Sequence, residues 1–318
     1  MRRHPPFAVA LAAATAAGLL PAAGCGDAGS VGGSGGVPGV VVTTSILGDV
    51  VENMTGDLAD VEIVMPTGAD PHEFQPSARQ AAAMREADLL VANGGGFEAG
   101  LVDTIRGAED DGVPVFEAVD HVDLLAVAGS EGGGSTGDEG ADPHVFTDPA
   151  RMATVGDALA GVLADEVPAL DTRAFRDRAA AYVAELRALD AEVEATLAAV
   201  PADRRKLVTN HDVFAYFADR YGFEIVGAVI PSTTTQAAPS AGEIDALAAT
   251  IAAEGVPAIF ADTSSPDDLA DTLAGEVGGD VGVVELYSES LGEAGSGADS
   301  YVGMMRTDAA RIAEALAP

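Results

Sequence analysis

The stretch VVVTTSILGDVVENMT, residues 40–55, sets the class of the fold. It opens with the β-branched run Val40–Thr44, which is typical of a short strand buried on both faces of a parallel sheet. Residues 45–55 then have the pattern of a helix. A strand followed at once by a helix is the repeating unit of α/β proteins, in which helices connect parallel strands. The stretch therefore predicts an α/β fold.

The same alternation recurs in two halves of the chain. In the first half we expect strands at 61–65, 89–92 and 113–116, and helices at 78–86 and 97–106. In the second half we expect strands at 206–209, 224–230, 257–261 and 282–286, and helices at 215–221, 243–254, 267–277 and 301–317. Between the halves, apolar residues recur at three- and four-residue steps over 171–200, which predicts a helix roughly 45 Å long. We predict two β/α lobes with mostly parallel four-stranded sheets, joined by one long rigid helix.

Composition and pattern together divide the chain into five expected segments. They are a signal peptide (1–24), a lipidated cysteine with a flexible Gly-rich tether (25–39), an N-terminal lobe (40–168), a linking helix (169–201) and a C-terminal lobe (202–318). Residues 129–140 interrupt the first lobe. They are acidic and rich in glycine, without a large apolar side chain, and this composition predicts a mobile loop.

The N-terminus has the features of a secretory signal. Met1-Arg2-Arg3 is positive, and the apolar run 7–20 is too short for a membrane-spanning helix, which needs about 20 residues. The residues before Cys25 resemble a bacterial lipobox, although Ala22 stands where Leu is usual. We expect lipidation of Cys25 and anchoring at the outer face of the cell membrane. The alternative is that this single cysteine, which excludes an internal disulfide, has no special role.

The charge of the chain excludes nucleic acids as partners. There are 16 Lys and Arg against 51 Asp and Glu, a formal net charge of −35. Such a surface repels DNA and RNA. It would attract cations weakly everywhere, but adaptation of the source to high salt, or a GC-rich genome, explains the acidity more simply than a cation funnel does.

Three of the five histidines lie in short, turn-like settings: GADPH at 68–72, DPHVF at 142–146 and TNHD at 209–212. Imidazole nitrogen is the commonest protein ligand for transition metals. A single histidine in such a setting is more often an ordinary core or surface residue. The repeated Asp-Pro-His favours a shared role for His72, His144 and His211.

Ligands of α/β folds bind beyond the carboxyl ends of the strands. His72 and His211 follow expected strands, His144 follows the acidic loop, and Glu289 follows the last strand. Three imidazoles and a carboxylate suit the tetrahedral preference of Zn(II), whereas Mn(II) prefers more oxygen ligands. Glu289 has the weakest signal, because the chain is full of acidic loop residues.

At these residues the chain resembles the zinc- and manganese-binding solute-binding proteins of bacterial ABC importers. The resemblance covers nearly all of the mature chain and rests on GADPHEFQP (68–76), DPHVFTDP (142–149) and HDVFAYFADRYG (211–222). It implies two β/α lobes joined by a rigid helix, with the metal site in the cleft between them. It also implies that His72, His144, His211 and Glu289 bind the metal.

Two departures from the family pattern stand out. The family usually has Asp where this chain has Glu289, and many zinc members carry a His-rich loop where residues 129–140 lack histidine. His211 argues for zinc, because manganese members often have a carboxylate there. The resemblance implies an extracytoplasmic, monomeric receptor that captures Zn(II), with Mn(II) as the alternative. It would deliver the ion to a membrane permease, and a cytoplasmic ATPase would drive import.

Two rival classes remain open at this point. Three histidines with an open fourth position would resemble the zinc of an enzyme, whereas a fourth protein ligand leaves no water to activate. We therefore expect no enzyme, and the chain has no Gly-x-x-x-x-Gly-Lys-Ser/Thr phosphate loop for ATP hydrolysis. The other rival is an adhesin or passive surface lipoprotein.

Overall fold

The computed structural model describes residues 37–127, 140–265, 268–278 and 281–318. The expected signal peptide, Cys25 and nearly all of the acidic loop lie outside the described residues. The boundaries of the five expected segments therefore stay predictions. None of the described helices combines the length and apolar character of a membrane span.

The first half of the described chain forms one parallel sheet with helices beside it. Its elements are β1 (Gly39–Val42), α1 (Ser45–Thr55), β2 (Asp60–Ile63), α2 (Ala78–Glu86), β3 (Leu89–Ala92), α3 (Val102–Asp110) and β4 (Val115–Glu117). The strand order is β2-β1-β3-β4, and every neighbouring pair is parallel. We call this sheet and its helices the N-terminal lobe.

The second half repeats this arrangement. Its elements are β5 (Lys206–His211), α6 (Ala215–Tyr221), β6 (Glu224–Ile230), α7 (Ala241–Glu254), β7 (Ala258–Asp262), α8 (Asp268–Val277), β8 (Gly282–Leu286) and α9 (Tyr301–Leu316). The strand order β6-β5-β7-β8 matches that of the first sheet, again with parallel pairs. We call this part the C-terminal lobe, and the predicted α/β class with two parallel four-stranded sheets is confirmed.

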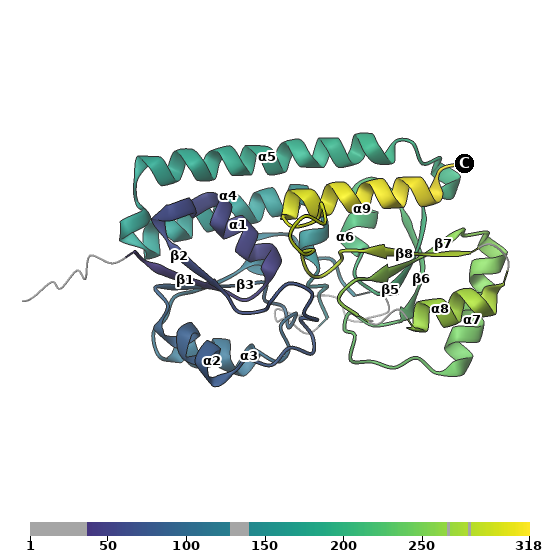
Figure 1. Cartoon of the computed structure of the whole chain (residues 1–318), viewed down its shortest axis with the longest axis horizontal. Helices are drawn as coiled ribbons and strands as arrows, with labels where there is room; N and C mark the ends of the chain where they lie inside the picture. The colour runs from purple at the N-terminus through teal and green to yellow at the C-terminus, as the bar shows by residue number, and fades with distance from the viewer. Residues whose placement is uncertain (1–36, 128–139, 266–267, 279–280) are drawn as a thin grey trace, which may run out of the picture. The chain divides into compact units, whose positions relative to one another are not determined.

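A long helix joins the two lobes. Helix α5 (Arg173–Leu197) is capped by the Thr172 hydroxyl, which accepts from the Phe175 N–H, and it runs alongside both lobes (Figure 1). The expected linking helix is thus present, although its helical turns begin later and end earlier than the 169–201 segment. Helix α4 (Pro149–Glu166) packs beside it.

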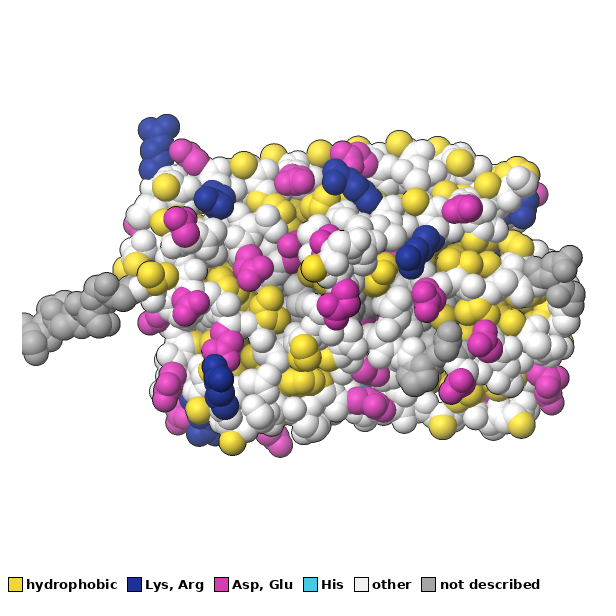
Figure 2. All heavy atoms as spheres, in the orientation of Figure 1, with side chains coloured by type: hydrophobic (Ala, Val, Ile, Leu, Met, Phe, Trp, Pro, Cys, Tyr) yellow, Lys and Arg dark blue, Asp and Glu magenta, His cyan; other side chains and the backbone are white. Residues whose placement is uncertain are grey.

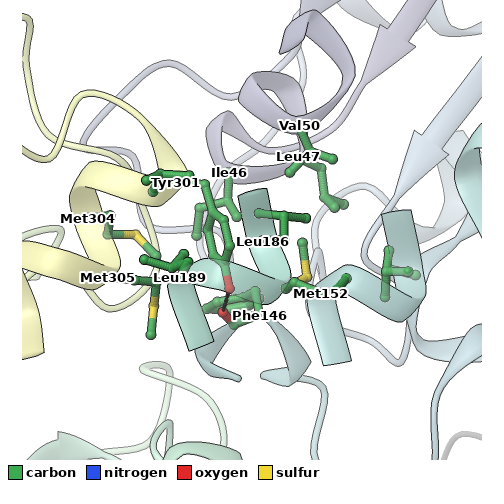
Figure 3. Close-up of a cluster of buried hydrophobic side chains, with 14 of the residues drawn as sticks. Ile46, Leu47, Val50, Phe146, Met152, Leu186, Leu189, Tyr301, Met304 and Met305 are labelled. Carbon is green, nitrogen blue, oxygen red and sulfur yellow. Dashed lines mark hydrogen bonds between the residues drawn. The ribbon is translucent and has the colours of Figure 1, made fainter. Parts of the chain in front are cut away.

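The largest apolar core is shared by the two lobes. It includes side chains from α1, α4, α5 and α9 and from the 3₁₀ turn 145–147. The residues labelled in Figure 3 are Ile46, Leu47, Val50, Phe146, Met152, Leu186, Leu189, Tyr301, Met304 and Met305. The Tyr301 hydroxyl donates to the Phe146 carbonyl oxygen at 2.8 Å and so satisfies the one polar group of that ring. This core fixes Phe146, two residues beyond His144.

Two local expectations need correction. The helix expected at 97–106 begins only at Val102, because the buried carboxylate of Glu98 folds back and accepts from the N–H groups of Asn93 and Gly94. This arrangement replaces a helical turn with a loop. Helix α4 was not predicted either, although Asp148 followed by Pro149 is a typical helix start.

Acidic side chains are spread over the face of the molecule shown in Figure 2.

Candidate metal site

The four candidate ligands converge at one buried point. Their ligand atoms all lie within 4.8 Å of one another, and each residue is buried. Glu289 Oε1 lies 2.8 Å from His72 Nε2, 3.0 Å from His211 Nε2 and 3.3 Å from His144 Nε2. Zinc–ligand bonds of about 2.0–2.1 Å in a tetrahedron place neighbouring ligand atoms about 3.3–3.4 Å apart. The three distances from Glu289 therefore come close to those of a tetrahedral site.

Loops and strand ends position the four candidate ligands. His72 lies in the turn between β2 and α2, and His144 directly precedes a short 3₁₀ turn. His211 is the last residue of β5, and Glu289 lies three residues beyond β8. The chain goes from β5 to β6 on one side and then returns to β7 on the other side, so the strand order changes direction between the adjacent strands β5 and β7. Ligands of open parallel sheets bind at such a point.

The two Asp-Pro-His segments form the same turn but use the aspartate differently. In each, the aspartate Oδ1 accepts from the histidine backbone N–H two residues later, at 2.8 Å for Asp70 and 2.9 Å for Asp142. Asp142 Oδ1 also lies 2.7 Å from His144 Nδ1. Asp70 Oδ2 instead accepts from the Thr235 hydroxyl at 2.7 Å.

Asp142 determines how His144 presents its ring. A carboxylate on Nδ1 holds the proton on that nitrogen and leaves Nε2 free to bind a metal. Burial alone would lower the pKa of His144. Hydrogen bonds and charge from Asp142 and Glu289 overcome that effect and raise the pKa to about 9.

Glu289 is the electrostatic centre of the cluster. Burial alone would raise its pKa, but the charge of His211 and hydrogen bonds from the three imidazoles hold the pKa well below the ordinary value. Its second oxygen, Oε2, is buried and has no hydrogen-bond partner among the described residues. A buried, unpartnered carboxylate oxygen costs free energy unless something compensates it, so the donor set fits a cation.

Aromatic rings line one wall of the cluster. The ring of Phe97 packs edge-on against His72 and His144, with centroids 5.2 and 5.5 Å apart. Phe146 packs against Phe97 at 5.2 Å. This apolar wall lowers the local dielectric constant and so strengthens the attraction between a cation and Glu289.

Sequence interpretation missed Asp262. This carboxylate is the last residue of β7 and is buried. Its Oδ1 accepts from the backbone and hydroxyl of Ser264, and its Oδ2 has no partner among the described residues. Burial and the charge of Glu289 raise the pKa of Asp262 to about 7. The one feature of the sequence that could have suggested a role for Asp262 is its position at the end of β7, the strand that pairs with the strand of His211.

Two parallel-sheet lobes with a buried cluster of three histidines and one carboxylate define a class, the metal-binding substrate-binding proteins of ABC importers. Within this class, the chain belongs to the family of the periplasmic zinc-uptake complex component A, ZnuA, whose model matches residues 40–315. The suspected family resemblance is thereby confirmed.

Named relatives span both metals. The zinc-binding protein TroA of Treponema pallidum is 34% identical over 289 residues, which cover 89% of this chain and 90% of TroA. The manganese-binding lipoprotein MntA of Halalkalibacterium halodurans is 29% identical, with 90% and 91% covered. The solved structure of Treponema pallidum TroA superposes with a TM-score of 0.79 at 31% identity, over 89% of this chain and all of that one.

Proposed function

We propose that this chain is the extracytoplasmic receptor of a zinc importer and that it binds one Zn²⁺ through His72, His144, His211 and Glu289. The carrying observation is the position of Glu289 Oε1 within 2.8–3.3 Å of three imidazole Nε2 atoms. A nitrogen-rich, four-ligand set suits Zn²⁺. Four protein ligands fill a tetrahedral site, so no metal-bound water is left to activate, which argues against an enzyme.

Manganese is the second candidate, and one observation favours it. The unpartnered Oε2 of Glu289 offers a fifth donor from the same carboxylate, and Mn²⁺ accepts more oxygen ligands than Zn²⁺ does. The name of the relative MntA, a manganese-binding lipoprotein, is consistent with that alternative. The three imidazoles weigh more, because nitrogen ligands suit Zn²⁺ and Mn²⁺ prefers oxygen ligands.

Competition between the two ions tests the proposal. Most nitrogen and oxygen sites bind Zn²⁺ more tightly than Mn²⁺, so displacement alone is weak support. The purified protein should therefore also be loaded with Co²⁺, whose visible absorption distinguishes four-coordinate from higher-coordinate geometry. We expect one ion per chain, Zn²⁺ displacing Mn²⁺, and a four-coordinate cobalt spectrum. Equal or tighter binding of Mn²⁺ would rule out the zinc assignment.

The remaining parts of the proposal concern location and partners. The loaded receptor would dock on a membrane permease whose cytoplasmic ATPase drives import, as the substrate-binding role in an ABC importer requires. Lipid on Cys25 would anchor it at the outer face of the membrane, and the relative MntA is itself named a lipoprotein. The mass of the mature N-terminal peptide tests this anchor. A peptide that begins anywhere except at a lipidated Cys25 would contradict it.

A further inference from the structure

The loop that carries His72 belongs to the N-terminal lobe but is held by the C-terminal lobe. The Thr235 hydroxyl donates to Asp70 Oδ2 at 2.7 Å, and the Gln236 amide donates to the His72 carbonyl oxygen. The Gly68 N–H donates to Ser290 Oγ at 2.8 Å. Thr235 and Gln236 lie between β6 and α7, in the C-terminal lobe. These three hydrogen bonds, together with the contact between His72 Nε2 and Glu289 Oε1, join this loop to the opposite lobe.

A cavity of about 410 Å³ lies beside these contacts. Gly95, Gly96 and Pro143 line it from one lobe, and Thr233, Thr234 and Gln236 line it from the other. His72 also lines the cavity, and among the described residues it is the one candidate ligand that does so. A cation that reaches the buried cluster from this cavity would meet His72 first.

We propose that Thr235 and Gln236 are positioning residues that clamp the His72 loop to the C-terminal lobe, and that the metal enters and leaves through the adjacent cavity. The proposal rests on the proposed metal-binding function. When the lobes separate, the bonds to Asp70 and to the His72 carbonyl break and His72 moves away from Glu289. The clamp therefore slows release of the metal, because these bonds must break before His72 can move away from Glu289.

Zinc-release kinetics test the clamp. Zn²⁺-loaded protein is mixed with excess chelator and the release rate is followed for the wild type and for Thr235→Val, which keeps the shape and removes the hydroxyl. A hydrogen bond to a charged group is worth roughly 1.5–3 kcal/mol, so release should become about tenfold faster or more. Thr235→Ser keeps the donor and should restore the wild-type rate to within about twofold.

A matched control lies two residues away. Thr233 lines the same cavity, and its hydroxyl forms no hydrogen bond with the described residues. Thr233→Val therefore measures what the loss of a cavity-lining hydroxyl alone does to the release rate, and Thr235→Val should exceed that effect. Gln236→Leu removes the second donor and should also speed release. Thermal unfolding of each metal-free variant shows whether it folds, and the Gln236 variant carries the test if Thr235→Val does not.

The His72→Ala background separates positioning from general loosening. If the clamp acts through His72, Thr235→Val should add no further acceleration there. A Thr235→Val protein that releases zinc at the rate of Thr233→Val would overturn the clamp and leave the metal site standing. An equal acceleration with and without His72 would overturn it as well. A wild-type protein that binds no zinc would instead remove the proposed function, and the clamp with it.

Discussion

A histidine that binds a metal through one ring nitrogen usually donates a hydrogen bond from the other nitrogen, which fixes the tautomer and the orientation of the ring. Asp142 accepts this hydrogen bond from His144. The carboxylate lies 2.7 Å from Nδ1 and also caps the backbone of the turn, so the ring has little freedom. The second oxygen of the equivalent aspartate, Asp70, instead accepts a hydrogen bond from Thr235 of the opposite lobe. The same three-residue motif therefore orients one candidate ligand, His144, directly and holds the loop that carries another, His72.

Removing the Asp142 carboxylate should weaken metal binding without abolishing it. Partners of metal-bound histidines typically contribute about 10–100-fold in affinity, so Asp142→Ala should weaken Zn²⁺ binding by that factor. Asp142→Asn should lose less, because the amide oxygen still accepts from Nδ1–H. A chelator-competition titration measures each variant. His144→Ala sets the upper limit of the loss, and wild-type affinity in Asp142→Ala would show that the ring needs no such support.

The residues of the candidate site differ in how far the sequence alone could predict them. The three histidines could be predicted from their short motifs, because each motif is a local feature of the sequence. Glu289 became a candidate mainly through the family resemblance, since one acidic loop residue looks like any other in a chain with 51 of them. The different contacts of Asp70 and Asp142 depend on the opposite lobe, and no local pattern contains that information.

At the scale of elements, strands and their following helices were the easiest to predict. The bounds expected for α2, β3, α6, β6 and β8 agree with those observed. The delayed start of α3 could not be predicted, because it depends on Glu98 reaching back to the end of β3 and to the Thr43 hydroxyl, 55 residues away in sequence. Burial raises the pKa of this carboxyl, and its hydrogen bonds oppose that rise.

The turn before α3 also packs closely against the His72 loop. A Cβ atom at Gly100 would lie far inside van der Waals contact with the Phe74 carbonyl oxygen, which is backbone and cannot rotate away. Gly100→Ala should therefore destabilise the protein by about 1–3 kcal/mol and, by displacing the loop, weaken metal binding. Denaturant unfolding and a zinc titration measure the two effects.

Gly161 provides the control for that substitution. It lies inside α4, and an added Cβ would meet no atom within 4 Å. Gly161→Ala should stabilise the protein by about 0.5–1 kcal/mol, because alanine favours the helix, and should leave zinc affinity unchanged. If Gly100→Ala were as harmless as Gly161→Ala, the close packing of this turn on the His72 loop would not be what holds the loop.

At the scale of the whole described unit, the core decides how the lobes unfold. One apolar cluster includes Val40 and Leu89 of the first sheet, Leu207 and Phe260 of the second, and the side chains of α5 between them. Neither lobe can lose the helices that it contributes to this core, α1 in the first lobe or α6 and α9 in the second, without exposing part of it. The two lobes should therefore unfold together rather than as independent domains.

The metal should act on this single transition. An ion held by ligands from both lobes binds only the folded protein, so at 100 times the dissociation constant it adds about 2.7 kcal/mol to the free energy of unfolding. Calorimetry should show one transition without metal and one transition, at higher temperature, with Zn²⁺. His72→Ala should lose most of the shift. Two separate transitions, of which zinc moves only one, would mean that the ligands of one lobe hold the ion alone and that the cluster does not join the lobes.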